Sequence, residues 1–227
     1  MRVILAIDTS TAQASVALSN KSGVQAEISW TAGSHHSTQL FRALDTLFEL
    51  SGSNIKDVGA LAVATGPGSF SGIRVGMSAS KAFALALDIP LAGVSTLDVL
   101  AAGSRGPSVC ALISAGRGQY YLARYQVQQS RVVRSSEYLL LSLSQLAAHV
   151  YEGDCLCGEE LPEVSEYLSA NGISVSREPW ASLRRASLLA ELGRAYFAQG
   201  GRDESHEAEP LYLRRSAAEE KRDAAQG

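Results

Sequence analysis

Apolar residues in the first half of the chain alternate between short runs and helical repeats. The short runs at 3–7, 14–18 and 23–30 predict three strands, because strands are short and favour apolar and β-branched side chains. A spacing of three and four predicts a helix over 39–50, which carries Leu40, Phe41, Leu44, Leu47 and Phe48. A bounded apolar run at 58–64 predicts a buried strand. The pattern then predicts a helix at 73–87 and a short helix at 95–102 that begins at Ser95 or Thr96.

The second half of the chain repeats this opening. Residues 109–124 align with residues 3–18 without a gap, each as an apolar strand, a small polar turn and a second strand. Turn-forming residues at 103–107 predict a hinge between the halves. The later pattern predicts, in order, a strand at 131–140, a helix at 142–151, a strand at 154–157, a helix at 161–170, a strand at 173–178 and a helix at 183–199.

These elements predict an α/β fold in two lobes. The order βββαβα is duplicated, and the second lobe is reduced. We therefore expect domains at 1–104 and 105–215, followed by a charged, flexible tail at 216–227.

The composition of the chain bears on whether it binds nucleic acid by itself. Its 227 residues are 46% hydrophobic and 19% charged, which fits a globular protein with a sizeable core, and its net charge is −3. A weakly acidic protein lacks the broad basic face that holds nucleic acid, so RNA contact is expected only together with another subunit.

Targeting signals and cysteine usage indicate a cytoplasmic protein. The N-terminal apolar run ends at Asp8, so no signal peptide is expected, and no run approaches the roughly 20 residues of a membrane span. The three cysteines, Cys110, Cys155 and Cys157, are odd in number and sparse, which indicates reduced thiols. Cys155 and Cys157 occupy alternate strand positions, so we expect both on one buried face.

The first turn of the chain carries a carboxylate and hydroxyl groups. Asp8, Thr9 and Ser10 follow the first predicted strand. In the actin/Hsp70/sugar-kinase superfamily such a turn places hydrated Mg²⁺ and touches phosphate. The alternative is a turn closed by local hydrogen bonds. Ser114 stands at the place of Asp8 in the second copy, so autonomous ATP hydrolysis is not expected.

A glycine-rich loop at 65–76 joins the strand at 58–64 to the next helix. Gly66, Gly68 and Ser69 let backbone N–H groups come close to a ligand at a helix N-terminus, which favours an anion, a phosphate or a partner backbone. The alternative is a tight turn followed by close helix packing. The loop is neither a Walker A sequence nor a regular GxGxxG.

Two histidines, His35 and His36, precede the helix at 39–50. Metal sites on one helix use ligands at i and i+4, because those positions share a face. The fourth residue after His36 is Leu40, and the fourth after His35 is Gln39. No metal site is therefore expected.

The two helices of the first half have wide apolar faces. Small residues recur every fourth position at Gly72, Gly76, Ser80 and Ala84, with Ile73 and Met77 beside them. This stripe permits close helix approach. Part of it is expected to pack on the chain's own sheet, because such a stripe more often belongs to the core than to an interface. The wide apolar faces together would also let the two helices form half of a bundle with a partner. Arg74 lies on the first helical turn, where it can pair with a phosphate or a partner carboxylate.

The loop at 65–76 closely resembles the signature of the bacterial TsaB family, formerly YeaZ. The turn at Asp8, Thr9 and Ser10 and the terminal element Pro210-x-Tyr212-x-Arg214 match that family as well. The resemblance implies the two-lobed actin/Hsp70/sugar-kinase-like (ASKHA) fold. It also implies a non-catalytic subunit of the machinery that makes N6-threonylcarbamoyladenosine (t6A) at position 37 of tRNA.

The same resemblance implies the partners. These are a TsaD-type transferase, a TsaE-type ATPase and possibly a TsaC-type synthase, with ATP or ADP and metal on the partners, no cofactor of this chain, and a homodimer through the same helices as a further use. Relatives of the TsaD type hold a metal through a His-x-x-x-His pair, which His36 and Leu40 do not make. The expected partner-binding residues are His36, Leu40, Leu44, Leu47, Ile73, Arg74, Gly76, Met77 and Ser80, and the candidate phosphate contacts are Asp8, Thr9, Ser10, Gly66, Gly68 and Ser69.

Two other functions stay open at this point. A small ATP-dependent phosphotransferase would use the turn at Asp8 and the glycine loop. A glycoprotease would need a metal site that the histidines do not supply.

Overall fold

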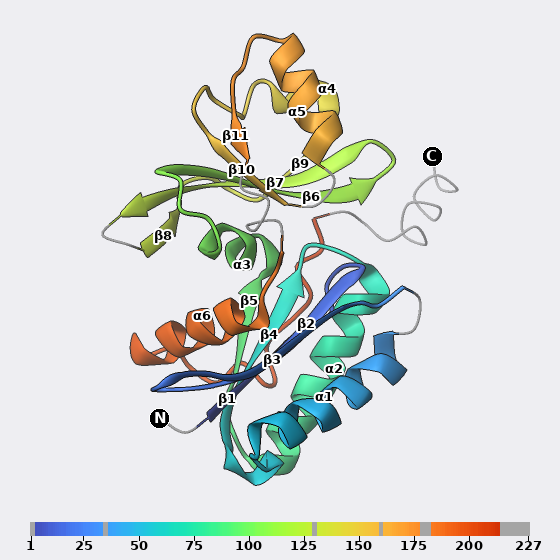
Figure 1. Cartoon of the computed structure of the whole chain (residues 1–227), viewed down its shortest axis with the longest axis vertical. Coiled ribbons are helices and arrows are strands. Elements are labelled where there is room, and N and C mark those ends of the chain that lie inside the picture. The colour runs from blue at the N-terminus through green and yellow to red at the C-terminus, as the bar shows by residue number, and fades with distance from the viewer. Residues whose placement is uncertain (1–2, 34–35, 129–130, 159–160, 178–182, 214–227) are drawn as a thin grey trace.

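The computed structural model of the chain places two mixed sheets one above the other along its longest axis (Figure 1). It describes residues 3–33, 36–128, 131–158, 161–177 and 183–213. Within this part no helix is both long enough and apolar enough to cross a membrane.

The first sheet has five strands in the order β3-β2-β1-β4-β5. β1 pairs antiparallel with β2 and parallel with β4, and β5 forms the far edge. The strands are β1 (Val3–Asp8), β2 (Gln13–Asn20), β3 (Gly23–Thr31), β4 (Val58–Gly66) and β5 (Leu91–Ser95).

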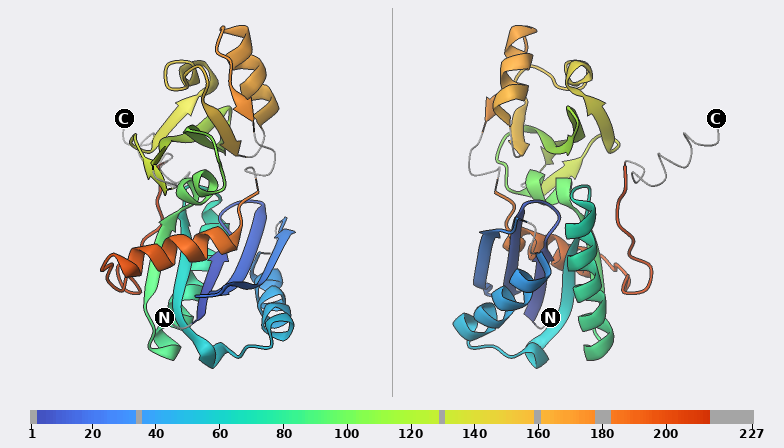
Figure 2. Two further views of the ribbon diagram at one scale, coloured as in Figure 1. Left: turned by 60° about the vertical axis from the view of Figure 1, so that its left-hand side comes forward. Right: turned by 90° about the vertical axis from the view of Figure 1, so that its right-hand side faces the viewer.

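Helices cover both faces of this sheet, which explains why β1 and β4 are almost entirely buried. α1 (His36–Ser51) and α2 (Phe70–Leu87) pack on one face, and α6 (Ala186–Ala198) packs on the other (Figure 2). The Ser69 side chain caps the N-terminus of α2, and Asp88 ends that helix in a left-handed conformation. A short 3₁₀ turn (Ile55–Asp57) precedes β4.

The second sheet has the order β11-β10-β6-β7-β8, with β9 paired to β7. α4 and α5 cover its outer face, and α3 (Thr96–Ala102) lies between the two sheets (Figure 1). The elements are β6 (Ser108–Gly116), β7 (Gln119–Gln128), β8 (Arg131–Arg134), β9 (Leu139–Ser142), α4 (Leu143–Leu146), β10 (Cys155–Gly158), α5 (Leu161–Ala170) and β11 (Ser176–Arg177).

The two sheets share one strand order, which confirms the predicted duplication. Strands β8, β7, β6, β10 and β11 correspond in turn to β3, β2, β1, β4 and β5. The gapless alignment is wrong by one residue at the turn: Asp8 pairs with Ser15, whereas Ser114 pairs with Tyr120. The second turn is therefore one residue shorter than the first.

Three predicted elements of the second half differ from the structure. The strand expected at 131–140 is two strands, β8 and β9, which both pair with β7. The helix expected at 142–151 is only the four residues of α4, and the strand expected at 173–178 is the two residues of β11. The tail at 216–227 lies outside the described residues.

α6 corrects the predicted domain division. We placed 105–215 in the second domain, but α6 packs against β1, β2, β4 and β5 of the first sheet. Gly193 permits this contact, because a Cβ there would lie 2.7 Å from Ala62 Cβ on β4. Residues 203–211, which we call the C-terminal strap, then run along the β5 edge of the same sheet, where the Glu204 backbone N–H donates to the Leu91 carbonyl oxygen at 2.9 Å.

Candidate functional site

The turn between β1 and β2 is closed by an arginine from the far end of the chain. Arg184 Nε donates to Asp8 Oδ2 at 3.1 Å, and each side chain is only 1% exposed. The other carboxylate oxygen accepts from the Ser10 backbone N–H at 2.8 Å and from Ser10 Oγ at 2.6 Å. Both oxygens of Asp8 therefore have partners within the chain.

Three further polar groups of Arg184 bind the same turn and the start of β2. Its Nη2 donates to Thr11 Oγ1 and to the Gln13 carbonyl oxygen, the latter at 2.7 Å. Its backbone N–H donates to Gln13 Oε1 at 3.2 Å, and its carbonyl oxygen accepts from Ser15 Oγ at 3.2 Å. A carboxylate that positions hydrated Mg²⁺ needs an oxygen that is free to accept from the metal-bound water. At Asp8 the Arg184 guanidinium occupies Oδ2, and Ser10 occupies Oδ1. The positive charge that a buried carboxylate requires thus comes from the chain itself.

The glycine-rich loop packs directly on this turn. The Ser69 backbone N–H donates to the Ser10 carbonyl oxygen at 2.6 Å, and Thr9 Oγ1 donates to the Gly72 carbonyl oxygen at 2.7 Å. A Cβ at Gly68 would overlap the Ser10 carbonyl oxygen. The structure thus brings the two candidate phosphate stretches together, and they bind each other.

Two further glycines of the loop are needed for close contacts. A Cβ at Gly76 would lie 2.5 Å from Thr9 Oγ1, so glycine allows α2 to approach the turn. A Cβ at Gly66, which has a positive φ of 104°, would lie 2.8 Å from Ile73 Cδ1 and 3.2 Å from the Leu211 carbonyl oxygen. These contacts match the tight-packing alternative for the loop.

A small cavity separates the two copies of the turn. Its volume is about 290 Å³, and its lining includes Thr11, Gly68, Ser114 and Tyr121. None of its lining residues is charged. Small-molecule pockets range from about 300 to 1,000 Å³, so this space is at or below the lower limit and offers no cation to a phosphate.

The predicted partner-binding residues need correction. Seven of them are buried in the core between the two helices and the first sheet: Leu40, Leu44, Leu47, Ile73, Gly76, Met77 and Ser80. In this chain their side chains serve the core, so the outward residues of the same helices are the ones open to a partner. The eighth, Arg74, is exposed. The ninth, His36, is the first residue of α1, and its side chain lies outside the described part of the structure.

The outward side of the same helices carries large apolar side chains. Phe41 and Leu50 on α1 are 52% and 69% exposed, and Leu85 on α2 is 76% exposed. Between Arg74 and Leu85 the outward side of α2 carries Ser78 and Ala82, which are exposed and have small side chains. We call the surface formed by Phe41, Arg74, Ser78, Ala82 and Leu85 the α1–α2 outer face. Leu50 follows Phe41 by nine positions, about 180° around the helix, so it lies on the opposite flank of α1.

Arg74 is held in place at one end of this face. Its guanidinium carbon lies 3.8 Å from the centroid of the Phe70 ring, and its Nε donates to Tyr212 Oη at 3.2 Å. The Phe70 and Tyr212 rings stack with centroids 5.2 Å apart. The element Pro210-x-Tyr212 therefore acts on α2 directly, while Arg214 lies outside the described residues.

Comparisons with known proteins decide the family. The family model described as "TsaD: tRNA N6-adenosine threonylcarbamoyltransferase" matches residues 11–176. The chain is 30% identical over 224 residues to "tRNA threonylcarbamoyladenosine biosynthesis protein TsaB" of Escherichia coli strain K12, covering 95% of this chain and 96% of that protein. The chain belongs to the TsaB family.

Solved structures agree with membership of the TsaB (YeaZ) family. YeaZ from Pseudomonas aeruginosa superposes with a TM-score of 0.80 at 26% identity, covering 94% of this chain and 100% of that one. Component A of the (R)-2-hydroxyglutaryl-CoA dehydratase of Acidaminococcus fermentans superposes with a TM-score of 0.53 at 10% identity, covering 87% and 100%. The latter likeness concerns the fold alone, and it agrees with the predicted two-lobed ASKHA architecture.

The sequence alone did not predict two features of the structure. One is the contact of Arg184 with the first turn, and the other is the exposure of Phe41, Leu50 and Leu85. Arg184 follows the second lobe by chain position, and no local pattern links it to Asp8. Phe41, Leu50 and Leu85 stand outside the buried helical stripe, and that offset is the signal that identifies them as surface residues.

The cysteines of the described residues form neither a disulfide nor a metal site. Cys110, Cys155 and Cys157 are free and buried, as predicted for Cys155 and Cys157, and burial raises the pKa of the Cys110 thiol. Among the described residues no group of three or more His, Cys, Asp or Glu side chains is arranged to hold a metal ion.

Proposed function

We propose that this chain is a non-catalytic subunit of t6A biosynthesis that binds and activates a TsaD-type transferase. The observation that carries the proposal is the Asp8–Arg184 pair, because it fills the one carboxylate turn that nucleotide-dependent chemistry would use. The name of the E. coli relative places that protein in this pathway. The chemistry would belong to the partner.

The α1–α2 outer face is the proposed contact with the transferase. Exposed apolar groups of the size of Phe41 and Leu85 are common in protein interfaces. Arg74 would add a charged contact, since Phe70 and Tyr212 already fix its guanidinium. A homodimer of the isolated chain would use the same face.

The proposal extends to the rest of the complex. Once bound, the two proteins would together form the surface on which a TsaE-type ATPase docks, and a TsaC-type synthase would supply the threonylcarbamoyl adenylate. Nucleotide and metal would reside on those partners, tRNA would be held only by the assembled complex, and the complex would act in the cytoplasm.

Co-purification with the TsaD-type protein of the same organism tests the contact. Phe41→Asp and Leu85→Asp each place a charge on the outer face and leave the core untouched, so we expect a normal circular dichroism spectrum and loss of co-purification. Val133→Asp is the matched control, because Val133 is 43% exposed on β8, in the second sheet. Retention of the partner by both outer-face variants would contradict the proposal.

Reconstitution tests the role in the pathway. The partner proteins should form t6A on tRNA only when this chain is present. ATP turnover by the purified chain alone, lost in Asp8→Ala, would instead favour the phosphotransferase.

A further inference from the structure

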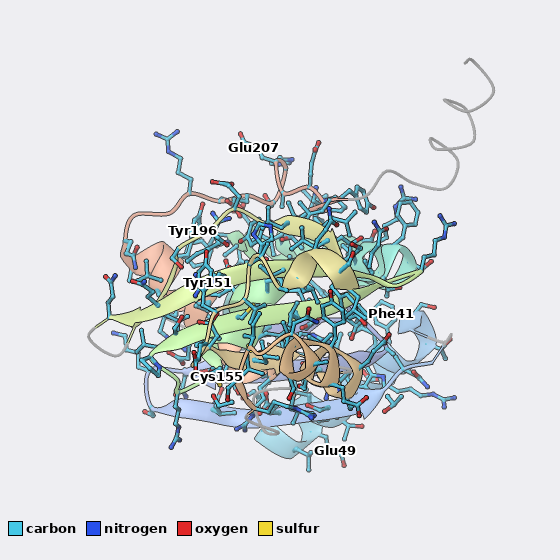
Figure 3. All side chains as sticks on the ribbon, turned by 90° about the horizontal axis from the view of Figure 1, so that it is seen from above. Phe41, Glu49, Tyr151, Cys155, Tyr196 and Glu207 are labelled. Carbon is cyan, nitrogen blue, oxygen red and sulfur yellow. The ribbon has the colours of Figure 1, made fainter. Side chains whose placement is uncertain are left out.

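A second surface of the molecule has the features of a binding groove. It has a volume of about 790 Å³ and is bounded by the C-terminal half of α6, by β5 and the start of α3, and by residues 204–211 of the C-terminal strap, with Tyr138 reaching in from the second lobe. We call it the α6 groove. Since α6 and α1 cover opposite faces of the first sheet, the groove is distinct from the α1–α2 outer face, and Figure 3 shows Glu207 and Glu49 on opposite sides of the molecule.

The charge of the groove has one sign. Its lining contains four carboxylates, Asp98, Glu204, Glu207 and Glu209, and no Lys, Arg or His. None of the four forms a salt bridge within the described part of the chain. The Arg134 guanidinium carbon lies 4.0 Å from the centroid of the Tyr138 ring, and Arg134 does not line the groove. A ligand of this groove would therefore be positively charged.

Two of these carboxylates are fixed in position. Asp98 accepts hydrogen bonds from Tyr138 Oη at 3.0 Å and from Tyr125 Oη at 2.7 Å. Glu204 accepts from the Gly93 backbone N–H at 2.7 Å and from Tyr196 Oη at 2.9 Å. Their negative charges are thus preorganised by neutral donors, which hold them without cancelling them.

The other two carboxylates are exposed at the rim. Glu207 and Glu209 belong to the strap, and both are open to solvent. Figure 3 shows Glu207 and Tyr196 on the same side of the molecule. A cationic group entering between strap and helix would meet these charges first, and rim charges of this kind steer association.

The floor of the groove suits an aliphatic stem. Leu192, Ala208, Pro210 and Leu211 contribute apolar surface, and the Tyr196 ring adds an aromatic face. Lys and Arg side chains bury their methylene groups on such surfaces while the charged head stays near carboxylates or over a ring. The combination fits these two residues better than a small inorganic cation.

Other ligand classes fit less well. Phosphates and nucleic acids would meet four negative charges. A metal ion would need carboxylate oxygens of Asp98 and Glu204 that already accept hydrogen bonds within the chain. Among the described residues no three His, Cys, Asp or Glu side chains are arranged to hold a metal ion.

We propose that the α6 groove binds an extended, lysine- or arginine-bearing segment of a partner protein. The volume of the groove admits several side chains of such a segment. The site is independent of the α1–α2 outer face, so the chain can hold one partner on each side of its first sheet.

Fluorescence anisotropy with a labelled peptide of four Lys-Ala repeats tests the groove at physiological salt, where diffuse attraction is screened. Ala195→Arg puts a positive charge into the groove, and Ala198→Arg makes the same change at an exposed α6 position that does not line it. We expect Ala195→Arg to weaken binding about tenfold and Ala198→Arg to leave it unchanged.

A second pair of variants removes charge instead of adding it. Glu207→Gln with Glu209→Gln should weaken the peptide about tenfold, whereas Asp45→Asn with Glu49→Gln on α1 changes the net charge equally and should have no effect. Equal effects of variant and control, absence of peptide binding, or equally tight binding of spermidine would each overturn the proposal. The assay uses the chain alone, so its result is independent of the transferase contact.

Discussion

Arg184 lies 3.1 Å from Asp8, measured from Nε to Oδ2, and links the segment that enters α6 to the first turn of the chain. The two residues are separated by 176 positions in sequence, and both are withdrawn from solvent. The pair makes the turn an internal structural contact. The glycine-rich loop, which packs on the same turn, becomes part of that contact.

Removal of Arg184 should destabilise the fold strongly. Arg184→Met leaves the Asp8 carboxylate buried without its cation, and breaking a buried pair in this way costs about 3–5 kcal/mol. The free energy of unfolding from urea titration measures the loss. Arg185→Met is the control, because Arg185 is 55% exposed where it pairs with Glu27, and the 12% exposed Glu27 carboxylate keeps the Ser187 backbone N–H as a donor, so a smaller loss is expected. Equal losses would show that the buried pair has no special role.

The glycine loop should be intolerant of alanine at the turn contact. Gly68→Ala drives a methyl group into the Ser10 carbonyl oxygen, and overpacking of this kind costs about 3 kcal/mol. Gly52→Ala is the matched control, since Gly52 has a positive φ of 63° but nothing within 4 Å of its Cβ position, and the conformational cost alone is about 1 kcal/mol. Thermal or urea unfolding of the two variants separates these costs. If Gly68→Ala loses no more than Gly52→Ala, the loop does not depend on its contact with the turn.

Hydrophobic periodicity predicted most of the fold, because both halves of the chain carry it strongly. It identified the stripe of Leu40, Leu44 and Leu47, but a period alone does not say what covers a stripe. In this chain the first sheet covers it, so the residues open to a partner are those that stand outside it, such as Phe41 and Leu85.

Hydrophobic periodicity did not predict contacts between segments that are far apart in the sequence. α6 has a helical pattern that would suit either sheet, and only the three-dimensional path of the chain returns it to the first. The Asp8–Arg184 contact has the same origin. Neighbouring residues in the sequence predict the turn at Asp8. The residue that pairs with Asp8, Arg184, is 176 positions away and reaches it only in the folded chain.

Alkaline pH should weaken the contact between the lobes at Asp98. Burial, together with the Asp98 charge, raises the pKa of Tyr138 to about 12, above the value of about 10 for an unfolded tyrosine. The contribution of neutral Tyr138 is therefore complete below about pH 10 and is lost as the pH rises toward 12. Urea midpoints measured across this range should fall less steeply in Tyr138→Phe than in the parent. Identical slopes would contradict the assignment.

The C-terminal strap should protect the edge of the first sheet. β5 is an edge strand, and the strap satisfies its backbone: Asp203 Oδ1 accepts from the Leu91 N–H at 3.0 Å, and Glu204 Oε2 accepts from the Gly93 N–H at 2.7 Å. Asp203→Ala with Glu204→Ala opens these donors, and open edges pair with other chains. We expect faster hydrogen exchange at Leu91 and Gly93 and concentration-dependent self-association in light scattering.

A charge-matched pair distinguishes edge protection from simple loss of acidity. Glu207→Ala with Glu209→Ala removes the same charge from the strap, but neither side chain has a recorded hydrogen bond to β5 among the described residues. This pair should keep the exchange rates and the molar mass of the parent. Self-association of both pairs to the same extent would mean that net charge, and not the capped edge, keeps the chains apart.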